Sequence, residues 1–152
     1  MKKIISLISI LSLLFLFSSS AFSQYKIGLG IRLSNSTPTL SNSVSVKYFH
    51  KENRAIEGLV SFGGTRFGLG GLYEIHTPMG TPGLQWYYGG GAYVGFQSGD
   101  TYLGPTGTVG LDYKFPNVPL NISLDWKPEL DILPGLNFVP DAFGLSVRFA
   151  FP

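Results

Sequence analysis

Apolar and polar residues alternate along most of the chain beyond residue 24, and the clearest run covers residues 120–127. An extended chain there would sort its side chains onto two faces: Leu120, Ile122, Leu124 and Trp126 on one, and Asn121, Ser123, Asp125 and Lys127 on the other. Successive side chains of a β-strand point to opposite faces. The alternation therefore predicts a strand with one apolar face.

Comparable alternation recurs along the chain and predicts eight strands in all. They cover residues 25–33, 43–50, 55–62, 67–76, 84–96, 105–115, 120–127 and 142–151. Segments rich in Gly, Pro, Ser and Asn separate them, as expected for turns and loops. The charged residues of these strands all share the face opposite the apolar one: Lys26, Arg32, Lys47, Glu57, Glu74, Asp112, Lys114, Asp125, Lys127 and Arg148.

The small side chains on the polar face indicate that this face lines an interior. It carries Gly28, Gly30, Gly68, Gly70, Gly89, Gly91, Gly95, Gly110 and Gly144. The interior of an eight-stranded barrel is only wide enough for side chains, so small residues suit it. Two tyrosines, Tyr87 and Tyr93, would fill the same space. The glycine runs do not form the Gly-x-Gly-x-x-Gly pattern that opens a phosphate-binding helix.

The apolar face would consequently point outward. Its aromatic residues gather near strand ends, with Tyr25, Tyr48, Trp86, Tyr113 and Phe151 toward one rim and Phe62, Phe67, Trp126 and Phe143 toward the other. Such girdles lie at headgroup level in outer-membrane barrels. On this assignment Leu124 faces lipid, whereas its neighbour Ser123 faces the lumen.

Residues 1–23 have the pattern of a cleaved secretory signal peptide. Lys2 and Lys3 precede an apolar run, and Ala21 and Ser23 supply small residues for cleavage before Gln24. The run is shorter than the roughly 20 apolar residues that a transmembrane helix needs. Residues 24–152 suit a single domain.

Composition narrows the class of protein further. Charged residues are 13% of the chain, against about 25% in typical soluble domains. The 11 Lys+Arg exceed the 9 Asp+Glu, but loss of Lys2 and Lys3 would balance them. A neutral domain without a basic run gives no reason to expect nucleic acid as a partner. The absence of Cys excludes disulfides, thiolate metal sites and a cysteine nucleophile.

These features predict an all-β fold, an eight-stranded antiparallel up-and-down transmembrane β-barrel after a cleaved signal peptide. Over residues 24–152 the chain resembles the small outer-membrane barrels of the OmpX and OmpA-transmembrane type. Its last strand, with Phe149-Ala150-Phe151, is similar to the terminal strand read by the barrel-assembly machinery, although Pro152 replaces the usual final Phe. The resemblance implies a cell outer membrane location and contact with its lipids and lipopolysaccharide, and it carries no catalytic residues.

With the N-terminus in the periplasm, the longer loops would be extracellular: residues 34–42, 97–104 and 128–141. We expect a non-enzymatic anchor that displays these loops to an extracellular ligand or partner. Two alternatives remain open. One is an outer-membrane enzyme or small-ligand carrier of the lipid-A-modifying barrel type, and the other is a soluble periplasmic β-barrel.

No catalytic, cofactor-binding or metal site is predicted, but several polar groups are candidates. His50 and His76 fall at the periplasmic ends of strands, where we expect rim residues. Glu74 and His76 are neighbours on the inward face, a spacing that could suit a metal but lacks a third ligand.

Two further groups of charged residues carry expectations. Around the last loop, acids that could converge on calcium are expected to be solvated instead: Asp125, Glu129, Asp131 and Asp141. Inside the barrel, Lys47 and Glu57 flank a turn about symmetrically, and we expect them to form an ion pair.

Overall fold

The structure, a computed structural model, describes residues 25–35, 39–63, 65–140 and 143–152. These residues form ten strands: β1 (Ile27–Ser34), β2 (Ser43–Lys51), β3 (Arg54–Gly63), β4 (Arg66–Pro78), β5 (Leu84–Gln97), β6 (Asp100–Lys114), β7 (Leu120–Trp126), β8 (Glu129–Asp131), β9 (Asn137–Val139) and β10 (Phe143–Phe151). The predicted signal peptide and its cleavage before Gln24 lie outside the described residues.

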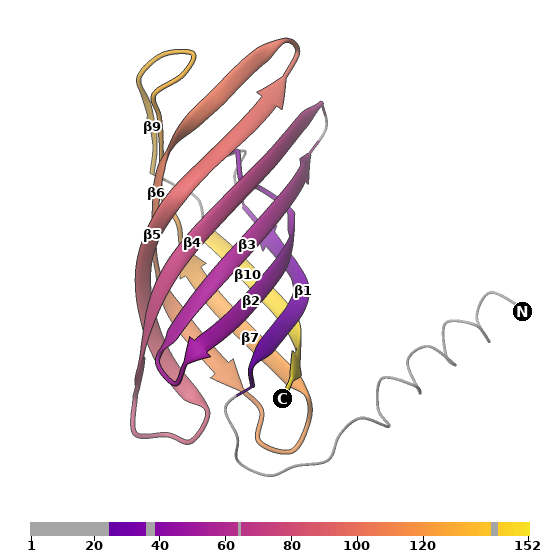
Figure 1. The fold of residues 1–152 in the computed structure, drawn as a ribbon, viewed down its shortest axis with the longest axis vertical. Coiled ribbons are helices and arrows are strands. Elements are labelled where there is room, and N and C mark those ends of the chain that lie inside the picture. Colours follow the sequence, from indigo (N-terminus) through magenta and orange to yellow (C-terminus); the bar gives the residue numbers. More distant parts are fainter. Residues whose placement is uncertain (1–24, 36–38, 64, 141–142) are drawn as a thin grey trace, which may run out of the picture.

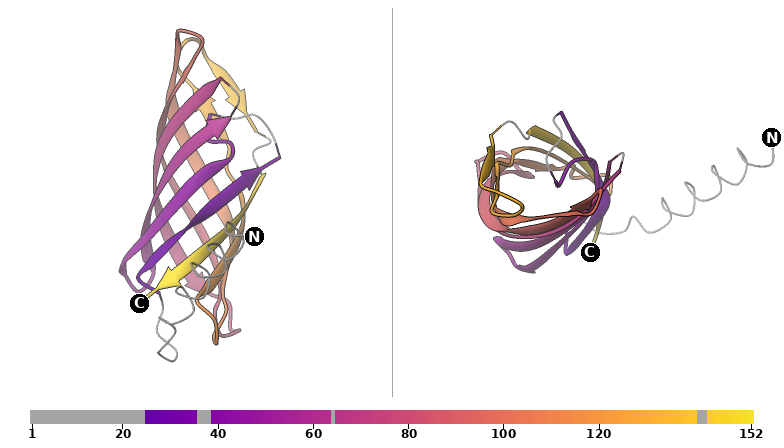
Figure 2. Two further views of the ribbon diagram at one scale, coloured as in Figure 1. Left: turned by 90° about the vertical axis from the view of Figure 1, so that its right-hand side faces the viewer. Right: turned by 90° about the horizontal axis from the view of Figure 1, so that it is seen from above.

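Eight of the strands form a closed antiparallel barrel. Strands β1 to β7 pair in chain order, β10 pairs with β7, and β10 also pairs with β1, which closes the ring. Figure 1 shows the tilted strands side by side, and Figure 2 shows the ring from above. The prediction of an all-β, eight-stranded antiparallel barrel is confirmed.

The remaining strands, β8 and β9, prolong the wall beyond β7 and β10. Trp126 of β7 lies opposite Val109 of β6, and Glu129 of β8 lies opposite Thr106 of the same strand. The pairing register with β6 is therefore unbroken across Lys127 and Pro128. β9 then pairs back onto β8 as a hairpin. The prediction that residues 128–141 form one irregular loop is thus wrong over these two strands.

The expected loop at residues 97–104 is also wrong, because β5 and β6 continue until they meet in a tight turn. Gln97 pairs with Asp100, so only Ser98 and Gly99 connect the two strands. Both have positive φ, 52° and 87°, as a type I′ hairpin turn requires. This turn fits the right-handed twist of the strands.

Apolar side chains cover the outside of this wall and charged side chains lie inside. Leu124 is 54% exposed and Ile31 52%, whereas Arg148 and Lys47 are 0% exposed. Exposed charged residues of the described wall strands stand at strand ends: Lys51, Arg54 and Asp100. In the described part of the chain, no helix is long and apolar enough to cross a membrane.

One residue of the predicted aromatic girdle lies elsewhere. Tyr25 is buried, and its ring packs edge-on against Phe49, with centroids 5.0 Å apart. The reason is that β1 begins only at Ile27, so the alternation of the strand does not reach Tyr25. Tyr48, Trp86, Phe62, Phe67, Trp126 and Phe143 are exposed on the outer face, as predicted.

Candidate functional site: the barrel interior

The lumen of the barrel holds most of the chemically distinctive side chains, in three layers. An aromatic floor lies at the end where the chain termini meet the barrel, a charged network lies above it, and an inward-folded loop closes the other end. The floor and the charged network share strands β2, β3 and β10, so the register of the sheet sets their order along the lumen.

The floor is a small apolar cluster. Tyr25, Phe49, Ala55 and Ala150 are all buried and in contact. Phe49 also packs against the ring of His76, with centroids 4.8 Å apart. These inward apolar side chains occupy the terminal end of the lumen, and the contact between Phe49 and His76 joins them to the polar groups above.

The charged network is built around two buried cations. Arg148 forms an ion pair with Glu57 and donates from Nε to Ser45 Oγ at 2.7 Å. Ser45 Oγ in turn lies 2.6 Å from Glu57 Oε1, and Arg148 Nη1 donates to Ser123 Oγ. A guanidinium presents a fixed fork of donors, so these partners hold Arg148 in one orientation across the lumen.

The second cation, Lys47, has a different partner from the one predicted. Lys47 and Glu57 do face each other across the β2–β3 ladder. However, the Lys47 ammonium lies 2.8 Å from Glu74 Oε2, without the angle of a hydrogen bond. The expected Lys47–Glu57 ion pair is therefore wrong. Arg148 of β10 pairs with Glu57 of β3 instead, and the Lys47 ammonium lies beside Glu74 of β4.

His76 lies within β4 rather than at the rim, which corrects that prediction, and it is buried on the inward face, as expected. Its ring stacks on Tyr87, with centroids 4.8 Å apart, and its Nε2 lies 2.9 Å from Glu74 Oε2. The error arose because β4 runs on to Pro78, so His76 lies within the strand. His50 is exposed, as predicted, with its ring 5.6 Å from that of Tyr73.

The pair formed by Glu74 and His76 is poorly suited to a metal. The Glu74 oxygen nearest the histidine is also the one beside the Lys47 ammonium. A cation at this position already compensates the carboxylate charge. Among the described residues, no group of three or more His, Cys, Asp or Glu side chains could hold a metal ion.

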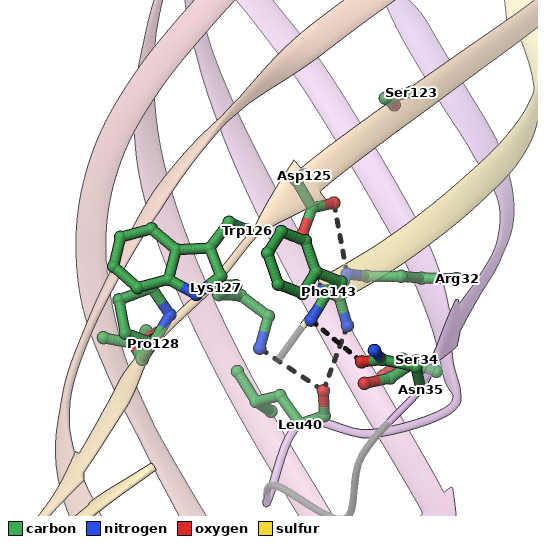
Figure 3. A network of polar contacts seen from close by, with 12 residues as sticks. Arg32, Ser34, Asn35, Leu40, Ser123, Asp125, Trp126, Lys127, Pro128 and Phe143 are labelled. Carbon is green, nitrogen blue, oxygen red and sulfur yellow. Dashed lines mark hydrogen bonds and ion pairs between the residues drawn. The ribbon is translucent and has the colours of Figure 1, made fainter. Parts of the chain in front are cut away.

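The opposite end of the lumen is closed by Thr39 and Leu40, which we call the plug. Both residues are buried, at 1% and 0% exposure. Glu129 of β8 accepts hydrogen bonds from both backbone nitrogens, at 2.7 Å from Thr39 and 2.9 Å from Leu40. Arg32 and Lys127 both donate to the Leu40 carbonyl at 3.3 Å, and Figure 3 shows these two bonds meeting on one oxygen.

Glycines of β4 and β5 form the socket for the plug. A Cβ atom on Gly68 would lie 2.7 Å from the Thr39 carbonyl oxygen, and one on Gly95 would lie 2.3 Å from Thr39 Cγ2. The Leu40 side chain of the plug packs with Leu59, Leu72 and Tyr93 in a buried apolar cluster. The glycines predicted to allow close inward packing therefore do so against a loop, not only against other strands.

The plug was missed by sequence reasoning, which assigned residues 34–42 to an extracellular loop. Residues 36–38 lie outside the described part, but Thr39 and Leu40 point inward. One signal was available: Leu40 is the only large apolar residue of this polar segment. An isolated leucine among Ser, Asn, Thr and Pro residues favours a buried contact.

The acids around the last loop do not converge on a common point. Asp125 pairs with Arg32 at 2.6 Å, Glu129 with Lys127 at 3.1 Å, and Asp131 accepts from the Tyr93 hydroxyl at 2.6 Å. All three are buried, so the expectation of solvated acids is wrong for them. Asp141 lies outside the described residues.

No protein-family model and no curated protein matches the chain. The described barrel combines a charge-lined interior, filled from both ends, with an apolar exterior.

Proposed function

We propose that the chain is a non-enzymatic integral outer-membrane β-barrel protein, a rigid anchor that displays its outer hairpins. The observation that carries the proposal is the inverted distribution of side chains: large apolar residues cover the wall outside, and the charged residues face the lumen. A closed barrel satisfies every backbone group of the wall without water, as hydrocarbon demands. Among soluble folds this distribution would be reversed.

The size of the apolar surface argues against the soluble periplasmic alternative. Side chains such as Phe62, Ile31 and Leu145 are 59%, 52% and 46% exposed, and they belong to one continuous wall. Soluble monomers rarely expose contiguous apolar patches larger than a few hundred Å². In a membrane, acyl chains would cover this apolar surface, so it would not be exposed to water.

The filling of the lumen favours an anchor over a pore or a carrier. Tyr87, Arg148 and Lys47 are each 0% exposed at mid-barrel, and the plug and the aromatic floor lie on either side of them. In the described part of the chain, the charged groups of the lumen are buried in ion pairs such as Arg148–Glu57 and Arg32–Asp125, away from a surface that a lipid substrate could reach. A lipid-A-modifying role would need such an exposed group.

The assignment of surface contacts follows from the corrected loops. Outer display falls to the β5–β6 hairpin rather than to Thr39 and Leu40, which are buried. Lipopolysaccharide and outer-membrane lipids would contact the wall, and the barrel-assembly machinery would insert the chain through its last strand. Any extracellular ligand or partner would meet the β5–β6 hairpin.

Fractionation of cells that express the chain tests this proposal. We expect the protein in the outer-membrane fraction, extractable only with detergent, and a mature N-terminus at Gln24 by N-terminal sequencing. Recovery in the soluble periplasmic fraction would contradict it. Analysis of lipid A from the same cells serves as a second readout, because a changed lipid A pattern would favour the enzyme alternative.

A further inference from the structure

The β8–β9 hairpin combines an uncharged outer surface with buried acids. Residues 128–140 contain two charged side chains, Glu129 and Asp131, which are 1% and 5% exposed because they face inward. The outward and apical side chains are apolar and exposed: Ile132 54%, Leu133 45%, Leu136 81% and Phe138 58%. A hairpin that stands in water normally carries charged residues on its exposed side.

This apolar surface is continuous with the wall of the barrel. The register between β6 and the β7–β8 segment is unbroken, and Gly107 N donates to Pro128 O at 3.2 Å across the junction. Leu130 therefore points to the same side as Leu124 and Trp126. Phe138 lies opposite Leu130 in the β8–β9 ladder and shares that side.

Strand length provides an independent argument. β7 has 7 residues and is the shortest strand of the wall, whereas a tilted membrane-spanning strand needs about 9–11. With β8 in the same register, the strand runs over residues 120–131 and reaches that length. The interruption at Lys127 and Pro128 then lies inside the membrane layer rather than at its surface.

We propose that the β8–β9 hairpin is not an extracellular ligand-binding loop but part of the lipid-contacting wall, with Phe138 and Leu133 covered by acyl chains of the outer leaflet. The inference rests on the proposed membrane location. Its polar inner side is held to the barrel by the Glu129 contacts with the plug and by the Tyr93–Asp131 hydrogen bond. The side chains on its outer side, such as Phe138 and Ile132, are apolar, which suits hydrocarbon.

The test uses single cysteines, because the chain has none of its own. Phe138→Cys and Leu133→Cys would each be labelled with an environment-sensitive fluorophore and folded into phosphatidylcholine vesicles. Leu124→Cys on the wall is the membrane control. Asp100→Cys, exposed beside the β5–β6 turn, is the control for water. Quenching by doxyl-labelled acyl chains is compared with quenching by iodide on both sides of the membrane.

We expect the labels at Phe138 and Leu133 to follow Leu124, with blue-shifted emission and doxyl quenching, while the label at Asp100 is quenched by iodide. If Leu124 is doxyl-quenched and Phe138 and Leu133 are iodide-quenched, the hairpin stands in water and only this inference is overturned. Self-quenching between labelled copies at Phe138 would instead assign the surface to a second chain and would also overturn it. Iodide quenching at Leu124 would contradict the membrane proposal itself.

Discussion

Glu129 is the residue on which the closure of the outer end depends most. Its carboxylate accepts two backbone N–H groups of the plug and pairs with the buried Lys127. The Glu129 carboxylate accepts from three donors. A Gln amide has one accepting oxygen and one NH2 group that only donates, so it cannot serve the same three donors. Loss of the carboxylate would leave Lys127 as an uncompensated buried charge.

We therefore predict that Glu129→Gln lowers the free energy of unfolding by about 3 kcal/mol, because removing one partner of a buried ion pair strands the other. The measurement is reversible urea unfolding in lipid vesicles. Glu52→Gln, in the exposed turn between β2 and β3, is the matched control and should be near wild type. Equal stability of the two variants would show that the plug does not depend on this carboxylate.

The partner of Lys47 is a second question at the residue scale. The structure pairs the lysine with Glu74 and leaves Glu57 to Arg148. In a double-mutant cycle, Lys47→Met and Glu74→Gln should show a coupling of roughly 1–3 kcal/mol. The cycle of Lys47→Met with Glu57→Gln should show a smaller one. A larger coupling to Glu57 would restore the pairing expected from the turn geometry.

At the scale of the strand, neighbouring glycines of β4 should respond differently to the same change. A Cβ atom at Gly68 would meet the Thr39 carbonyl oxygen, while one at Gly71 would meet nothing within 4 Å. Gly68→Ala should therefore cost about 1–3 kcal/mol through overpacking, and Gly71→Ala should be neutral or stabilising. Urea unfolding in vesicles compares the two. Equal effects would mean that the plug does not rest in this socket.

The strands themselves could be predicted because alternation is a local property of the sequence. Each wall strand has one lipid-compatible face, so the period of two identifies it wherever a face is uniform, as at residues 120–127. The same reasoning explains the correct register of Lys47 opposite Glu57. Turn residues then gave most strand ends to within a few positions.

The errors occurred where long-range contacts override local pattern. Residues 97–104 look polar and loop-like, but pairing with β5 extends β6 through Thr101 and Leu103. Thr39 and Leu40 fold inward because Glu129, far away in sequence, binds their backbone. The choice of Glu74 by Lys47 likewise depends on Arg148, which closes the barrel from its last strand. Alternation within one segment contains none of this information.

For the molecule as a whole, we propose that the apolar wall, which encloses a filled, charged interior, faces lipid. Leu124 is a suitable probe because it is 54% exposed near the middle of β7. Its neighbour Ser123 is 1% exposed and accepts a hydrogen bond from Arg148. A substitution there, such as Ser123→Asn, would disturb that contact, so Ser123 is a poor control position for a substitution at Leu124. Asn117, exposed in the turn before β7, is a better one.

The most direct test of this claim is the stability of Leu124→Arg in lipid vesicles, measured by reversible urea unfolding beside Asn117→Arg. We predict a loss of about 2–4 kcal/mol for Leu124→Arg, since an arginine on the lipid face at mid-membrane must enter hydrocarbon, and almost none for Asn117→Arg. If Leu124→Arg inserts and folds as well as wild type, the outer wall does not face lipid and the account is wrong.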